Sequence, residues 1–300
     1  GGIPAVIATG KKNGPWNGIE FYSGNFYISE GGINEGGKIL KISPEGKITS
    51  LVENLPSYGD HHVNGPVINN NNIYFTIGTA TNSGVVGNDN YKYGWLQRRK
   101  GFHDVPCQDV TLSGVNYLTD NIFTVERDEA VTGPYLPYNT KALKGQVIKG
   151  KTPCGGAVFS LPLEGGEPKL VAWGLRNPFG IGWAGGKLYV AENGFDERGS
   201  RPVWGAGDAF WEINEGTWYG WPDFSAGKSI VNDEEFKSPG GSKVEATLLN
   251  YPNLPPKPAG ILGVHSASCG FDFSTNQNFG YVGQAFIAQF GDMAPEVGKV

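Results

Sequence analysis

The sequence has 300 residues, of which 47 are Gly and 20 are Pro, and its formal net charge is −5. Gly and Pro interrupt the chain so often that the longest stretch free of both, residues 115–132, has only 18 residues. Coiled coils, helical bundles and helical solenoids need longer uninterrupted periods, so these classes are excluded. The acidic balance argues against nucleic acid as a partner, and no run of 18 apolar residues is present that would cross a membrane.

A strand–turn–strand unit recurs along the chain. In each copy, alternating apolar and polar residues predict two short strands, with a tight turn between them. The four copies are 18–21 with 26–31, 65–68 with 73–78, 180–183 with 188–194, and 270–273 with 285–291. A third strand is predicted at 38–42, 157–161 and 209–213.

The spacing of these units favours a propeller. The first two copies begin at Gly18 and Gly65, 47 residues apart, which is close to the period of a four-stranded propeller blade. A β-sandwich would explain the strands but not the repeated unit. We therefore expect an all-β fold: one β-propeller domain over residues 1–300 with four-stranded antiparallel blades. An irregular insertion interrupts it at about 84–150, and the visible units are too few for a closed ring of six, so we expect a fragment.

The cysteines leave two interpretations open. Cys107 and Cys154 each follow a Pro, and they stand at the two ends of the irregular segment. Their spacing supports a disulfide and a pair of free thiols about equally. Because the chain has no C-x-x-C motif and no Cys/His cluster, a zinc site is not expected.

Three loops carry candidate chemistry, because loops beside the inner strands of a propeller converge on its axis. Asp60 and His61 lie in the first, and a His beside a carboxylate is either a general base or the cap of a turn. Arg176 and Asn177 lie in the second, where the guanidinium either binds an anion or packs between blades. The third surrounds Gly194, where backbone and side-chain oxygens suit a calcium ion or form a solvated acidic turn.

Together these stretches resemble the quinoprotein glucose/sorbosone dehydrogenase family, the soluble sugar dehydrogenases that use pyrroloquinoline quinone (PQQ). The resemblance rests on motifs in consistent order at 37–40, 55–57, 60–61, 73–78, 174–178, 192–194 and 219–222. It implies a six-bladed propeller with the cofactor on its axial face. It further implies a sugar or sugar aldehyde as substrate, a separate electron acceptor, and a periplasmic or secreted location.

The resemblance also implies catalytic roles. His61 would be the base that removes the proton of the substrate hydroxyl while hydride passes to the quinone. Asp60 would orient that base, and Arg176 would stabilise negative charge on the reduced quinone.

Cofactor and metal contacts follow from the same resemblance. Asn177 and Asn193 would contact PQQ together with Arg176. Backbone carbonyls at Gly194 and Phe195 would bind the calcium ion that polarises the quinone. Well-studied glucose dehydrogenases of the family carry Gln-Gly-Pro where this chain has Asn-Gly-Phe at 193–195.

Two other functions compete with this one. The first is a non-catalytic binding propeller that has lost the cofactor. The second is a calcium-dependent lactonase-like propeller, which would need several carboxylates on the axis. The dehydrogenase hypothesis requires His61, Arg176 and Asn193 to face one cavity.

Overall fold

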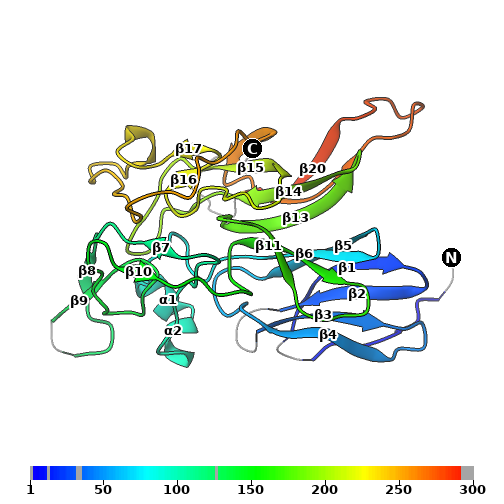
Figure 1. Ribbon diagram of the computed structural model, residues 1–300, viewed down its shortest axis with the longest axis horizontal. Coiled ribbons are helices and arrows are strands. Elements are labelled where there is room, and N and C mark those ends of the chain that lie inside the picture. The colour runs from blue at the N-terminus through cyan, green and yellow to red at the C-terminus, as the bar shows by residue number, and fades with distance from the viewer. Residues whose placement is uncertain (1–2, 12–13, 32–35, 126–127, 292–300) are drawn as a thin grey trace.

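The computed structural model describes residues 3–11, 14–31, 36–125 and 128–291. Within these residues the chain forms mainly antiparallel sheets, three of which have four strands. The three four-stranded sheets begin in chain order, and the C-terminal hairpin follows them (Figure 1). No helix in this part of the chain is long and apolar enough to cross a membrane.

The first sheet is a four-stranded meander. Its strands, in the order in which they pair, are β1 (Trp16–Tyr22), β2 (Asn25–Glu30), β3 (Gly37–Ile42) and β4 (Ile48–Leu55). A two-residue turn joins β1 to β2, and both of its residues, Ser23 and Gly24, have positive φ. A turn of this kind has the twist that matches the flanking strands of a hairpin, so the hairpin predicted from the sequence is confirmed.

The second sheet is split by the long insertion. Its strands pair in the order β12 (Lys169–Trp173), β11 (Ala157–Pro162), β6 (Asn72–Ile77) and β5 (Val63–Asn69). The β5–β6 turn has positive φ at Asn70 and Asn71. The chain leaves the sheet after β6 and returns at β11, so the insertion lies between the second and third strands.

The third sheet carries its insertion one strand later. Its strands pair in the order β13 (Asn177–Ala184), β14 (Lys187–Asn193), β15 (Gly207–Ile213) and β18 (Gly260–Val264). Between β15 and β18 lie β16 (Phe224–Ser225), β17 (Lys228–Ser229) and a 3-10 helix, η1 (Glu234–Phe236). A final hairpin pairs β19 (Ser268–Phe273) with β20 (Ala285–Gln289).

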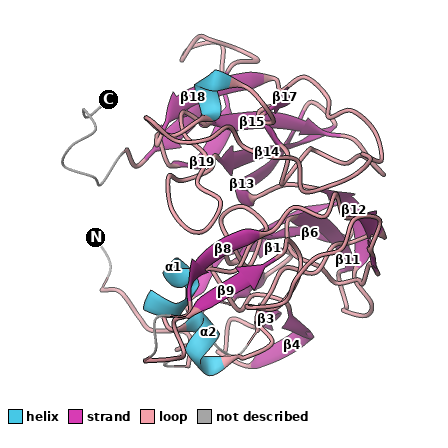
Figure 2. Cartoon of the chain, turned by 90° about the vertical axis from the view of Figure 1, so that its left-hand side faces the viewer, coloured by secondary structure: helices cyan, strands magenta, loops and turns pink. Residues whose placement is uncertain are grey.

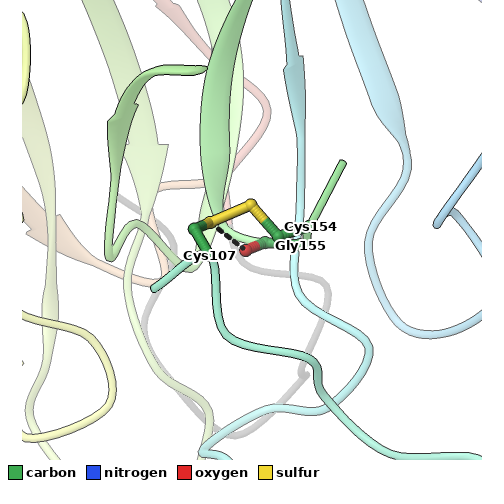
Figure 3. The surroundings of a disulfide bond; sticks show 3 residues. All are labelled: Cys107, Cys154 and Gly155. Carbon is green, nitrogen blue, oxygen red and sulfur yellow. Dashed lines mark hydrogen bonds between the residues drawn. A yellow bond between two sulfur atoms is a disulfide. The ribbon is translucent and has the colours of Figure 1, made fainter. Parts of the chain in front are cut away.

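The insertion between β6 and β11 contains short elements that the sequence did not predict. They are α1 (Asn88–Lys92), α2 (Trp95–Arg98), β7 (Val110–Thr111), β8 (Tyr117–Asp120), β9 (Glu129–Thr132) and β10 (Val147–Ile148). Figure 2 shows both helices beside the β8–β9 hairpin. Cys107 and Cys154 form a disulfide across the base of this segment, with Cα atoms 5.1 Å apart (Figure 3). Of the two interpretations of these cysteines, the disulfide is therefore the correct one.

The first strands of successive sheets lie against one another. Strand β5 packs against both β1 and β13, and β13 packs in turn against β19. A Cβ atom at Gly18 would lie 1.8 Å from the carbonyl oxygen of Gly65, and one at Gly180 would lie 2.1 Å from that of Cys269. At Gly18 and Gly180 the recurring Gly is therefore a packing requirement between neighbouring sheets, whereas a Cβ at Gly270 would meet nothing within 4 Å.

Large aromatic side chains are buried around the second and third sheets. Trp211 and Trp218 are fully buried, and Trp221 is nearly so. The amide of Trp221 donates to the carbonyl of Gly174, and the amide of Tyr219 donates to that of Trp173. The segment thus extends the edge of β12.

The all-β fold and the four-stranded antiparallel sheets are confirmed. Closure into a ring, the number of six blades and the assignment of one domain stay predictions.

Candidate functional site

The residues singled out from the sequence line one cavity of about 280 Å³. They are Asp60, His61, Arg176, Asn177, Asn193, Gly194 and Phe195. The loop before β5, the start of β13 and the end of β14 bring them together, because these segments lie at the same end of adjoining sheets. The condition that the dehydrogenase hypothesis set, one shared cavity, is met.

His61 is held from behind by the segment that follows β6. Its imidazole is 7% exposed, and Nδ1 lies 3.0 Å from both the carbonyl oxygen and the hydroxyl of Thr79. A carbonyl oxygen only accepts hydrogen bonds, so Nδ1 carries the proton and Nε2 is the free base of the neutral ring. Burial, together with the positive charges of Arg176 and Arg198, lowers the pKa of His61 well below 6.5. The ring is therefore neutral at pH 7, with its lone pair on Nε2.

Asp60 lies on the opposite side of the ring from Thr79. Its Oδ2 atom is 3.6 Å from Nε2 of His61 and forms an ion pair with Arg198. The family resemblance implied that Asp60 orients His61, but the contacts at Nδ1 come from Thr79. Asp60 instead places a carboxylate beside the basic nitrogen.

Arg176 is buried and rigidly held at the start of β13. Its Nε donates to the carbonyl and side-chain oxygens of Asn82 at 3.1 Å, and its Nη2 contacts Asp196 at 2.8 Å. Its backbone amide donates to Glu192, whose carboxyl also accepts from Trp211. Burial raises the pKa of Glu192 to about 7. Among the described residues, no partner is found for Nη1 of Arg176, so that amino group remains for a ligand.

Arg198 links three carboxylates at the wall of the cavity. It pairs with Asp60, with Asp196 at 3.0 Å and with Asp89 of α1 at 2.8 Å. The loop at 194–207 is thereby tied both to the segment before β5 and to the long insertion. Each of these charges is only partly exposed, which limits screening by solvent.

The buried carboxylate of Asp208 holds the backbone next to Asn193 in place. Asp208 is 2% exposed and accepts hydrogen bonds from the amides of Gly194 at 2.8 Å and Ser268 at 2.7 Å. Asn193 donates to the carbonyl of Ser268, while its own carbonyl accepts from Asn177 at 2.9 Å. The side chains of Asn177 and Asn193 therefore bond to each other, and Asp208 ties together the starts of β15 and β19.

Oxygen atoms crowd around Gly194. A Cβ there would lie 2.5 Å from the carbonyl oxygen of Ala206 and 2.7 Å from that of Gly207. Phe195 is buried, with its ring 6.0 Å from the guanidinium of Arg176. Within the described ranges, no group of three or more His, Cys, Asp or Glu side chains is placed to bind a metal ion.

Sequence reasoning missed several residues that hold the site together. Thr79 and Asn82 come from the segment that follows β6, Asp208 from the start of β15, and Arg198 from the loop after β14. Arg198 stands in the loop where calcium binding is expected, and its position two residues after Asp196 is a signal that the sequence contains. A fifth, His265, bonds to Glu197 at 2.9 Å and also borders the cavity.

No protein-family model matches the sequence, and no curated protein matches it either. Solved structures do match in three dimensions. The soluble aldose sugar dehydrogenase of Escherichia coli in its apo-form aligns with a TM-score of 0.50 and 13% identity, over 89% of this chain. A glucose dehydrogenase aligns with a TM-score of 0.52 and 14% identity, over 96% of this chain and 69% of its own.

The chain shares the fold of soluble sugar dehydrogenases. The resemblance drawn from the motifs therefore agrees with the likeness in three dimensions. The chain spans 62% of the length of the Escherichia coli enzyme, so the neighbour contains structure that has no counterpart here.

Proposed function

We propose that the chain belongs to a quinoprotein oxidoreductase that oxidises a sugar or sugar aldehyde at the cavity of His61, Arg176 and Asn193. The observation that carries the proposal is a neutral, buried His whose basic nitrogen lies beside a carboxylate. The shared fold with sugar dehydrogenases supports the same class of activity. The full enzyme would form a six-bladed propeller and pass electrons to a separate acceptor. The disulfide is consistent with a periplasmic or secreted location.

The residues present fit a carboxylate-bearing cofactor and a hard cation. Nη1 of Arg176 has no partner in the part of the chain that the structure describes, and a guanidinium is the side chain best suited to carboxylates. The carbonyl oxygens of Ala206 and Gly207 lie close to Gly194, and backbone carbonyl oxygens are a ligand type that calcium prefers. Arg176, Asn177 and Asn193 would hold PQQ, and the backbone at Gly194 and Phe195 would hold calcium. When bound, PQQ would supply a quinone that accepts hydride, and calcium would make that quinone more electrophilic.

The chain's own contribution is the handling of the substrate hydroxyl. Nε2 of His61 would accept the proton of the substrate hydroxyl, and the hydrogen on the carbon that bears this hydroxyl would pass as hydride, with both electrons of the C–H bond, to the bound quinone. The hydroxyl carbon thereby becomes a carbonyl carbon. Asp60 stabilises the imidazolium that forms, because its carboxylate lies 3.6 Å from Nε2. Thr79 keeps the ring in the productive tautomer throughout.

A binding propeller that has lost the cofactor is the second candidate. The paired amides of Asn177 and Asn193 favour it, because they satisfy each other within the protein. Under that hypothesis the cavity would bind a sugar without oxidising it.

Reconstitution separates the two candidates. The chain, in its full-length protein, is titrated with PQQ in the presence and absence of calcium, and oxidation of a panel of aldoses is followed with an electron-accepting dye. The proposal expects a calcium-dependent absorbance change and dye reduction by at least one aldose. Sugar binding without any spectral response to PQQ would favour the binding propeller.

A further inference from the structure

We propose that Asp104, a residue of the insertion, is a positioning residue that holds His61 in place through the backbone of residues 79–81. The inference rests on the proposed function only for the role of His61. Asp104 itself does not border the candidate site and lies on the other side of this segment.

Asp104 anchors the segment with both carboxylate oxygens. It is 3% exposed, and its Oδ1 accepts from the amides of Ala80 at 2.6 Å and Thr81 at 3.4 Å. Its Oδ2 accepts from the hydroxyl of Thr81. Three donors on two residues thus converge on one side chain, which fixes both the position and the direction of this backbone.

The opposite side of the same segment faces the candidate site. The carbonyl and hydroxyl of Thr79 lie against Nδ1 of His61, and the carbonyl of Ala80 accepts from the amide of Asp60 at 3.0 Å. The hydroxyl of Thr79 also donates to the carbonyl of Thr81 at 2.7 Å. Movement of residues 79–81 would therefore move the ring of His61 and the backbone of Asp60 together.

Burial raises the pKa of Asp104 to about 7, while the hydrogen bonds from Ala80 and Thr81 favour its carboxylate form. It lies at the wall of a separate cavity of about 450 Å³, which Arg99, His103 and Lys151 also line. The negative charge of Asp60, across the segment, raises the pKa of Asp104 further, and the charge of Asp104 in turn raises the pKa of Tyr135. An amide at this position would offer one acceptor oxygen in place of two, so one of the two sets of donors would lose its partner.

The test uses NMR of the histidine nitrogens in the whole chain without added cofactor. Wild type is expected to show His61 as a single tautomer with a proton on Nδ1 that exchanges slowly with water. Asp104→Asn is expected to speed that exchange at least tenfold and to shift the titration of His61. Thr81→Val, which removes one of the three donors, is expected to have a smaller effect in the same direction.

The control is Asp109→Asn. Asp109 lies in the same insertion, and its carboxylate likewise accepts a hydrogen bond from a backbone amide, that of Gly150. It is expected to leave the His61 signals unchanged. If Asp104→Asn and Thr81→Val both fold and both leave the tautomer, exchange rate and titration of His61 as in wild type, the inference is wrong. Because no step needs PQQ or turnover, this result is independent of the reconstitution experiment.

Discussion

The Nδ1 atom of His61 lies 3.0 Å from the carbonyl oxygen of Thr79, a residue that stands 18 positions later and follows the neighbouring strand β6. This contact decides which nitrogen of the ring is basic. It places the lone pair on Nε2, towards Asp60 and the cavity. The acid–base chemistry of the site therefore depends on the pairing of β5 with β6, which sets the segment behind His61.

The pH dependence of catalysis follows from the environment of His61. A base acts only when deprotonated, and the pKa of this His is lowered well below 6.5 by burial and by two Arg residues. The value of kcat/KM should therefore stay level down to pH 6.5 and fall only at more acidic pH. A profile measured from pH 4 to pH 8 checks this. An acidic limb centred above pH 6.5 would contradict the assigned environment.

Gly78 provides the space that His61 occupies. A Cβ at this position would lie 2.2 Å from the Cβ of His61, so Gly78→Ala must displace the ring. We expect kcat to fall about 100-fold, because a shift of about 1 Å is enough for such a loss. Gly270→Ala is the control, since a Cβ there meets nothing within 4 Å. Equal activities of the two variants would show that the ring position is not critical.

Asp208 should be important for stability as well as for the site. Asp208→Ala leaves the buried amides of Gly194 and Ser268 without partners, at a cost of about 3–5 kcal/mol in the free energy of unfolding. Urea denaturation measures this loss. Glu167→Ala, at an exposed position, should change the free energy by less than about 0.5 kcal/mol. A loss below about 1 kcal/mol for Asp208→Ala would contradict the role of its hydrogen bonds.

The disulfide should stabilise the insertion chiefly through the unfolded chain. Its cysteines are 47 residues apart, and closing a loop of that length is worth about 4 kcal/mol. The double variant Cys107→Ala, Cys154→Ala should lose about that amount and become insensitive to reductant. Cys269→Ala, which removes the free cysteine, should keep the stability and the reductant sensitivity of wild type. A double variant as stable as wild type would overturn this account.

Much of the fold could be predicted from sequence because its signals are local. The turns at Ser23–Gly24 and Asn70–Asn71 indicate hairpins, because Gly, Asn and Ser in short turns tolerate positive φ. Alternation of apolar and polar residues then fixes the flanking strands. The short helices of the insertion gave no comparable signal, since α1 and α2 have only five and four residues.

The candidate site was predictable only in part. His61 and Arg176 stand in motifs that a reader of the sequence can find. Their partners Thr79 and Asn82 could not be found that way, because they are brought close by strand pairing rather than by spacing. The same holds for Asp208, whose four donors come from two segments, 193–194 and 266–268, that are far apart in the chain.

The most direct test of the central claim compares wild type with His61→Gln in the full-length protein reconstituted with PQQ and calcium. Gln fills similar space but cannot take up a proton. The account predicts that kcat for aldose oxidation falls by about 10²–10⁴-fold, while the dissociation constant for PQQ changes less than about threefold. A His61→Gln variant that retains kcat within a few-fold of wild type would contradict the assignment of His61 as the base.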